Sequence, residues 1–420
     1  MAETRKVYLD HSATTPVDRR VVEAMLPYLT EKFGNASSVH AFGQEARAAV
    51  DRARREVAAL IGARANEIVF VSGGTEANNL ALRGITDASL TRKNLSNGNS
   101  TSKGHVITSS IEHPSVRGIS DELEKQGWDI TRLPAYEEGI VRTEDVRAAL
   151  RPETVLISVM LANNEIGTLQ PIAEIGALVR EERAQRINGP QILFHCDAVQ
   201  AAGRIPLNTE ALGCDLLSLS AHKIYAPEGT GALFVRRGVR LVPQNVGGHQ
   251  EREKRAGTEG VPGIVAFGMA AKLAREEMVE RTEHERRLRD RFEAGVTERI
   301  EDIVFNGDHA RRLPHLSNIS FRFIEGEGLL ISLDLLGVAV STGSACSSGT
   351  LEPSPVIQAL GRNDELARGA IRFSFGKDNT VEDVDYVLEV LARVVEKLRQ
   401  LSPLNKRSTM TKAAESLRSR

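Results

Sequence analysis

The sequence predicts an α/β protein with a mostly parallel sheet in a large domain and a second, smaller α+β domain. Short apolar runs alternate with longer helical patterns from about residue 45 to residue 240, which is typical of a parallel sheet covered by helices on both faces. A chain of 420 residues is too long for one simple core. From about residue 262 the pattern changes to a long charged helix followed by further strands and helices.

The predicted strands of the large domain are short apolar runs. In chain order they are "EIVFVS" (67–72), "HVITSS" (105–110), "VLISVML" (155–161), "QILFHC" (191–196), "LLSLSA" (216–221) and "GALFVRR" (231–237). Apolar residues at helical spacing in "QEARAAVDRARREVAALIG" and "PIAEIGALVREERAQ" predict helices between them. Ligands of such sheets bind beyond the carboxyl ends of the strands, so the chemistry is expected there.

We expect the large domain to span residues 20–261 and the small domain to combine residues 1–19 with 262–420. One long charged helix is predicted over residues 263–300. Residues 89–104 are polar and rich in Ser, Asn and Gly, which predicts a surface loop insertion.

Composition and charge exclude several classes of protein. A net charge of −2 provides no positive field for phosphates, which argues against direct nucleic-acid binding. Three cysteines do not make a disulfide framework and favour a reducing compartment. The N-terminal segment resembles no targeting peptide and no run is long enough to span a membrane, so we expect a cytoplasmic enzyme. The basic tail over residues 405–420 is predicted to be frayed.

Each predicted strand of the large domain, up to "LLSLSA", is followed by a compact polar cluster. In chain order the clusters contain Ser72, Gly73, Gly74 and Thr75; His113; the "ANNEIG" segment with Asn164; Asp197 and Gln200; and Ser220, His222 and Lys223. The first cluster opens a helix, whose free N–H groups and dipole favour a phosphate. It is neither a P-loop nor a dinucleotide fingerprint, which counts against kinases and dehydrogenases.

An aspartate and a lysine at neighbouring strand ends, facing a phosphate-type turn, are what a pyridoxal-phosphate site needs. Lys223 would form the Schiff base, and Asp197 would keep the pyridine nitrogen protonated. Two alternatives remain open from the residues alone. One is an Asp–Lys ion pair with a helix cap. The other is a metal site at His195, Cys196, Asp197 and His222, which no further His/Cys cluster completes.

The third cysteine, Cys346, lies in "STGSACSSGT" (341–350), a segment of small side chains that can support no core. This segment and the motifs "YLDHSATTP", "FGNASSVH", "VSGGTEANN", "EHPSV", "NNEIG", "DAVQ", "SAHKIYAPEGTGAL", "RAGTEGV", "LEPSPVIQALG" and "IRFSFG" together resemble the ordered motifs of NifS/IscS-type cysteine desulfurases. The resemblance runs from Tyr8 to about Pro403. It implies the aspartate-aminotransferase-like fold (pyridoxal-phosphate fold type I) with a seven-stranded sheet.

The resemblance implies roles for individual residues. Lys223, Cys346 and His113 would be catalytic, and Arg372 and Asn35 would bind the substrate carboxylate. The residues implied to bind pyridoxal 5'-phosphate are Lys223, Asp197, Gln200, Thr75, Gly74, Asn164, Ser220, His222 and Thr258. Thr258 would reach the cofactor of the neighbouring subunit, so a homodimer is expected.

The implied reaction converts L-cysteine to L-alanine and leaves the sulfur on Cys346 as a persulfide. Its implied acceptors are an iron–sulfur scaffold protein or sulfur-relay proteins, including those of tRNA thiolation. No resident metal is expected, beyond a transient contact of Cys346 with a cluster in a scaffold complex. Cys196 and Cys214 lie in or beside apolar strands and are predicted to be buried. The alternatives are a selenocysteine lyase or another enzyme of the same fold, and a catalytically inactive scaffold.

His11, Ala36 and Ala221 depart from residues common in the family, and none removes a catalytic group.

Overall fold

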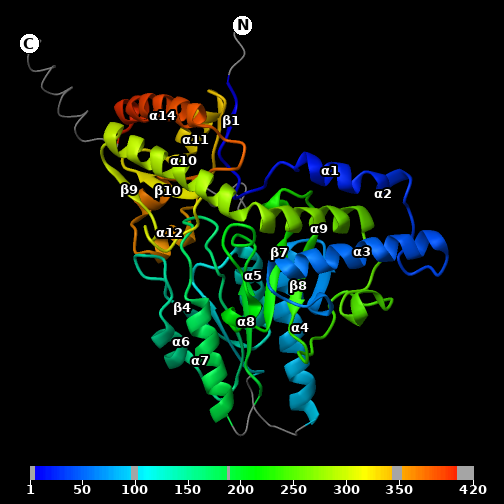
Figure 1. The fold of residues 1–420 in the computed structure, drawn as a ribbon. Helices are drawn as coiled ribbons and strands as arrows, with labels where there is room; N and C mark the ends of the chain where they lie inside the picture. Colours follow the sequence, from blue (N-terminus) through cyan, green and yellow to red (C-terminus); the bar gives the residue numbers. More distant parts are fainter. Residues whose placement is uncertain (1–4, 96–102, 187–189, 343–351, 404–420) are drawn as a thin grey trace, which may run out of the picture.

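The computed structural model describes residues 5–95, 103–186, 190–342 and 352–403. Its centre is a seven-stranded sheet of order β2-β8-β7-β6-β5-β3-β4, in which only β8 runs antiparallel to the others (Figure 1). The strands, in spatial order, are β2 (Ile68–Val71), β8 (Gly231–Val235), β7 (Leu216–Ser220), β6 (Leu193–Asp197), β5 (Thr154–Ser158), β3 (His105–Ser109) and β4 (Asp129–Leu133). The predicted mostly parallel sheet is confirmed.

Helices cover both faces of this sheet. Successive side chains of a strand point to opposite faces, and in β2 Ile68 and Phe70 join one core while Val69 and Val71 join the other. The first face is covered by α1 (Arg19–Met25), α3 (Ala41–Leu60), α6 (Thr143–Ala149), α7 (Ile172–Gln185) and α9 (Val261–Glu276). The second face is covered by α4 (Gly74–Leu95) and α5 (Pro114–Lys125).

A smaller group of elements forms a separate core. Its antiparallel sheet has the order β12 (Ala370–Ser374), β10 (Leu316–Phe321), β9 (Ile303–Phe305), and a parallel pair joins β1 (Val7–Tyr8) to β11 (Val338–Ala339). The helices α10 (Met278–Arg299), α11 (Gly326–Asp334) and α14 (Val381–Leu401) pack on it. Val7 and Leu9 are buried in the same core as Phe373, so the N-terminal segment packs with the C-terminal third.

The remaining elements are short. They are α2 (Pro27–Thr30), α8 (Thr209–Leu212), α12 (Pro355–Ala359), α13 (Asp364–Arg368) and the 3-10 turns η1 (Ala65–Glu67), η2 (Ala221–Ile224) and η3 (Gln250–Glu253). Within the described ranges, the helices are too short or too polar to cross a lipid bilayer.

The structure corrects two predicted elements. The helix expected over 263–300 is broken at Glu277, because α9 buries its apolar residues in the first core and α10 buries Leu288, Phe292 and Val296 in the smaller one. Residues 89–95 of the loop expected over 89–104 belong to α4 instead, and residues 96–102 lie outside the described residues. The domain boundaries stay a prediction, and core membership associates α9 with the large sheet. The tail over 405–420 lies outside the described residues.

Glu112 ties together the ends of two neighbouring strands. Its Oε1 accepts hydrogen bonds from Ser109 Oγ at 2.6 Å, after β3, and from Met160 N at 2.9 Å, after β5. Burial raises the pKa of the Glu112 carboxyl to about 8 because the charged form is poorly solvated there. Glu112 is therefore mostly protonated at neutral pH.

We predict that Gly268→Ala destabilises the contact between α9 and α3. A Cβ at Gly268 would lie 2.5 Å from Ala53 Cα and 2.6 Å from Ala53 Cβ, so the helices must separate, at a cost of about 1–3 kcal/mol. Gly118→Ala is the matched control. Gly118 is an exposed helical glycine with no atom within 4 Å of its Cβ position, and its substitution should stabilise by about 0.5–1 kcal/mol. Urea unfolding of both variants measures the difference, and equal midpoints would contradict the close packing.

We predict that Glu112→Gln makes stability less sensitive to pH. The pKa of Glu112 is about 8 in the folded chain and 4.5 in the unfolded chain. Between these two pH values the folded chain therefore keeps a proton that the unfolded chain has lost. The contribution of Glu112 to stability is complete below pH 4.5 and is lost as the pH rises towards 8, by on the order of 3–5 kcal/mol.

Urea unfolding of the cofactor-free wild type and of Glu112→Gln at pH 5 and pH 8 measures this effect. The variant should gain stability relative to the wild type at the higher pH, and a pH-independent difference would contradict the prediction.

Candidate active site

A cavity of about 400 Å³ lies beyond the carboxyl ends of β3, β5, β6 and β7, where polar side chains were predicted to converge. Its lining residues are Ser12, Ala13, Gly74, Thr75, Asn78, His113, Ser115, Met160, Asn164, Asp197, Val199, Gln200, Ser220, His222, Lys223 and Arg372. The structure therefore brings together most of the predicted site residues. Ser12, Ala13, Asn78 and Ser115 were not among them.

Asp197 ends β6 and is 5% exposed. Its Oδ2 accepts a hydrogen bond from Asn78 Nδ2 at 2.8 Å, and its Oδ1 accepts one from Val199 N at 3.0 Å. Asn78 lies on α4, one turn after Gly74 and Thr75, and no local pattern distinguished it from an ordinary helical asparagine. These two donors hold the carboxylate in one orientation.

Lys223 lies in η2, directly after β7. Its Nζ donates to Ser12 O at 2.6 Å and also to Ala13 O. Gln200 Nε2 donates to the same Ser12 oxygen at 3.0 Å. The N-terminal segment thus orients the lysine amine, a contact between residues 211 positions apart that no strand or helix pattern could indicate.

The turn that carries Lys223 is anchored on both sides. Thr15 Oγ1 donates to His222 O at 2.7 Å and accepts from Tyr225 N at 2.8 Å. Tyr225 has a left-handed φ of 71°, an unfavourable conformation for a bulky residue that these contacts must support.

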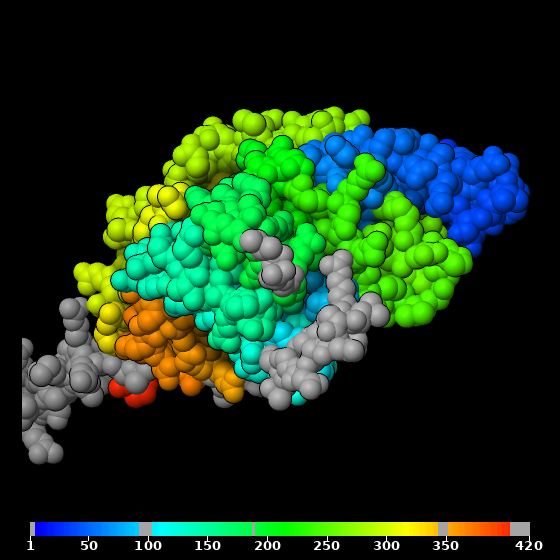
Figure 2. All heavy atoms as spheres, turned by 90° about the horizontal axis from the view of Figure 1, so that it is seen from below, coloured from blue at the N-terminus to red at the C-terminus, as the bar shows by residue number. Residues whose placement is uncertain are grey.

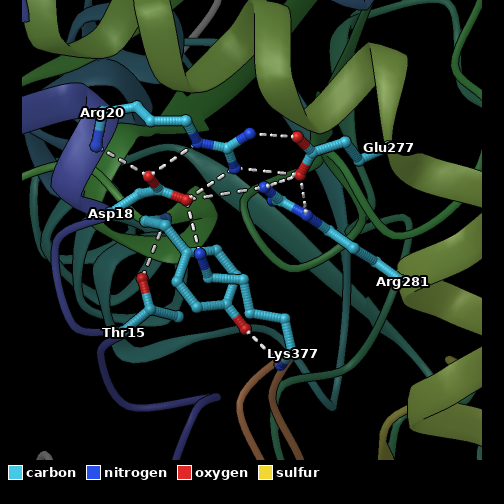
Figure 3. Close-up of polar contacts among 7 residues, drawn as sticks. Thr15, Asp18, Arg20, Glu277, Arg281 and Lys377 are labelled. Atoms are coloured by element: carbon cyan, nitrogen blue, oxygen red, sulfur yellow. Dashed lines mark hydrogen bonds and ion pairs between the residues drawn. The ribbon is translucent and has the colours of Figure 1, made fainter.

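Lys377, which follows β12, donates its backbone N–H to Tyr225 Oη at 2.9 Å and its Nζ to Asp18 (Figure 3). Asp18 also accepts from Arg20, and Arg20 pairs with Glu277. The hydrogen bonds from Arg20, with Lys377 adding to them, hold the pKa of Asp18 well below its usual range. This network fixes the lysine turn relative to the strand that carries Arg372.

The polar end of the cavity suits a phosphate. Gly74 and Thr75 open α4 and present backbone N–H groups, and Ser220 and His222 line the same cavity. A Cβ at Gly74 would lie 2.8 Å from Val199 Cγ2, so glycine permits the close approach. Burial, with Lys223 adding to it, lowers the pKa of His222 to about 4, and the ring is neutral at pH 7.

His113 caps α5, and its Nδ1 accepts from Ser115 N at 3.1 Å and lies 2.8 Å from Ser115 Oγ. Burial lowers the pKa of His113, with Lys223, Arg117 and Arg372 adding to the effect against the opposing charge of Asp197. The imidazole is therefore favoured in its neutral form, which can accept a proton.

Arg372 lies on β12 with a side chain that is 3% exposed. Its Nη1 donates to Asn164 O at 2.8 Å and its Nη2 to Asp10 Oδ1 at 2.7 Å. Among the described residues, its Nε and Asn164 Oδ1 are buried and lack a hydrogen-bond partner. Buried polar atoms are seldom left unsatisfied, so these two atoms indicate a polar ligand in the cavity.

Three predicted site residues are not placed in this cavity. Thr258 is exposed and lines a separate cavity of about 200 Å³. Asn35 is exposed and accepts from Ser37 N through its own Oδ1. Cys346 lies outside the described residues. Ser341, the first residue of the segment 341–350 that contains Cys346, exchanges two backbone hydrogen bonds with Arg372, at 2.7 and 3.2 Å.

The other two cysteines are buried, as predicted. Burial raises the pKa of Cys214 to about 12 and that of Cys196 well above its usual value, so neither supplies a thiolate. His195 lies between Ser158 Oγ, at 2.9 Å, and Ser218 Oγ, at 3.0 Å. The described residues contain no cluster of His, Cys, Asp and Glu able to hold a metal ion.

Comparisons with known proteins agree with this geometry. The family model of the aminotransferase class-V family matches residues 7–387. The cysteine desulfurase IscS of Dictyoglomus turgidum is 50% identical over 95% of this chain and 97% of its own length. The cysteine desulfurase IscS of Methanosarcina thermophila is 47% identical over 97% and 96% of the two chains.

Solved structures show the same relationship. A NifS-like protein superposes with a TM-score of 0.84 at 34% identity, covering 94% of this chain and 100% of that one. A structure described as SspA in complex with cysteine superposes with a TM-score of 0.75 at 33% identity, covering 89% and 99%. This chain therefore belongs to the class-V aminotransferase family and, within it, to the cysteine desulfurases of the NifS/IscS type.

Proposed function

We propose that this protein is a pyridoxal-phosphate-dependent cysteine desulfurase that converts L-cysteine to L-alanine and passes the sulfur to Cys346 as a persulfide. The observation that carries the proposal is the convergence of Lys223, Asp197, His113 and Arg372 on one cavity. Two relatives that match nearly the whole chain are named cysteine desulfurase, which supports the same reaction.

The lining residues fit the cofactor. Gly74, Thr75, Ser220 and His222 would hold its phosphate, and Asp197 would keep a proton on its ring nitrogen. When bound, pyridoxal phosphate supplies an electron sink for negative charge that develops at the substrate Cα.

The protein's own groups would carry the remaining steps. Arg372 and the side chain of Asn164 would bind and orient the substrate carboxylate. The Lys223 amine would remove the proton from the substrate Cα, and neutral His113 could assist in proton transfer. Cys346, as a thiolate, would form an S–S bond with the substrate sulfur while the Cβ–S bond breaks and alanine leaves.

A homodimer is the expected assembly. Four apolar residues from α2 to the start of α3 are exposed to solvent: Leu29 (55%), Phe33 (60%), Val39 (89%) and Phe42 (52%). Such exposure of apolar residues is typical of a surface covered by a partner. Residues 236–260, which follow β8, lie beside α3 (Figure 2). The buried Arg54–Glu251 ion pair joins this segment to α3. Val246, 88% exposed, and Thr258 belong to this segment.

The sulfur acceptors are expected to be an iron–sulfur scaffold protein or sulfur-relay proteins, including those of tRNA thiolation. Both classes of protein would take the sulfur from the same persulfide. The cytoplasmic location of the enzyme stays a prediction.

Lys223→Ala and Cys346→Ala should each reduce L-cysteine turnover by on the order of 10³-fold or more, because each removes a group that touches the reacting atoms. Alanine and sulfide release in the presence of a reductant measure this. Cys214→Ala, which changes a buried thiol, is the control and should retain activity. Wild-type turnover in Cys346→Ala would disprove the proposed sulfur acceptor.

Val39→Glu should raise the dimer dissociation constant by on the order of tenfold or more, because it places a charge among the exposed apolar residues Leu29, Phe33 and Phe42. Leu335→Glu is the matched control, since Leu335 is 78% exposed and lies after α11. Sedimentation over a protein concentration series measures both. An unchanged dimer in Val39→Glu, or equal weakening in Leu335→Glu, would refute this interface.

A further inference from the structure

Arg372 is paired with a carboxylate that does not line the cavity. Arg372 itself lines the cavity, and its Nη2 donates to Asp10 Oδ1 at 2.7 Å. Asp10 follows β1, and its backbone forms a parallel bridge with Ser374, the last residue of β12. The side chain of Asp10 is 18% exposed and that of Arg372 is 3% exposed, so the ion pair is largely shielded from water.

A buried guanidinium needs a counter-charge because desolvation of an unpaired charge is costly. Asp10 provides that charge, and Asn164 O accepts from the other terminal nitrogen, Nη1, at 2.8 Å. The two contacts hold the guanidinium plane in place. They leave Arg372 Nε buried and without a partner among the described residues.

We infer that Asp10 is a positioning residue that orients Arg372 and limits how tightly it binds the α-carboxylate of the substrate and the product. The inference rests on the proposed function, in which Arg372 binds that carboxylate. A ligand carboxylate is then a second anion beside a guanidinium whose positive charge Asp10 already balances. The two carboxylates repel each other at this short range in a poorly solvated site, so the ligand binds more weakly than it would to an unpaired arginine.

This limit suits an enzyme whose substrate and product share the same carboxylate. Binding energy that is equal in substrate, transition state and product lowers KM without raising kcat. It also slows the release of L-alanine. Asp10 holds the guanidinium in one orientation and at the same time weakens the part of the binding that does not contribute to catalysis.

Two substitutions separate the charge of Asp10 from its hydrogen bond. Asp10→Asn keeps an oxygen that can accept from Arg372 Nη2 and removes the negative charge. Asp10→Ala removes both. Glu293→Gln is the control, because Glu293 forms a similarly shielded pair with Arg312, at 2.6 Å, with side chains 13% and 10% exposed, and neither residue lines the cavity.

Spectrophotometric titration of the holoenzyme compares L-alanine with ethylamine, which is L-alanine without its carboxylate. In Asp10→Asn the Kd for L-alanine should fall about fivefold, and the Kd for ethylamine should not change. The KM for L-cysteine should fall in parallel, with kcat within about twofold of the wild type. Asp10→Ala should bind L-alanine more weakly than Asp10→Asn, because the arginine loses its orienting contact. Glu293→Gln should match the wild type for both ligands.

An unchanged Kd for L-alanine in Asp10→Asn would overturn the inference, and so would an equal change for ethylamine, which would indicate a general distortion of the cavity. Equal binding by Asp10→Ala and Asp10→Asn would refute the orienting role. Absence of L-cysteine turnover in the wild type would instead contradict the proposed function, and the comparison of L-alanine with ethylamine would still test Asp10.

Discussion

The segment of residues 12–18 crosses the turn that carries Lys223, and the geometry of the cavity depends on this crossing. Ser12 O receives hydrogen bonds from both Lys223 and Gln200, and Thr15 bonds to the backbone on both sides of the lysine. The residues just before this segment contribute Val7 and Leu9 to the smaller core. The segment therefore connects the large sheet, which carries Asp197 and Lys223 at its edge, with the smaller core, which supports Arg372.

The electrostatics of the site follow from how little water reaches it. Burial favours neutral His113 and lowers the pKa of His222 to about 4. It also keeps Glu112, which accepts a hydrogen bond from Met160 N, mostly protonated. The charges that remain are paired or hydrogen-bonded, as Asp197 is with Asn78 and Arg372 is with Asp10. A site of this kind holds an anionic ligand through a small number of oriented donors.

Local patterns predicted those parts of the fold that local physics controls. The apolar runs marked the strands from β2 to β8 with the exception of β4, whose exposed and half-buried residues lack an apolar run. The helix over 263–300 was predicted as one element because its spacing is continuous, and only the two separate cores show why it breaks at Glu277. Ser12 and Asn78 were missed because their contacts to Lys223 and Asp197 join distant parts of the chain.

The sequence by itself determined the alternation of strands and helices, and with it the edge of the sheet where Asp197 and Lys223 meet. The carboxyl ends of parallel strands lie at one edge, so residues that follow each strand are brought together whatever the loops do. Only the tertiary structure decided that Asp10 pairs with Arg372 and that Ser12 holds Lys223. These contacts depend on how two separately packed cores are placed against each other, which no periodicity along the chain encodes.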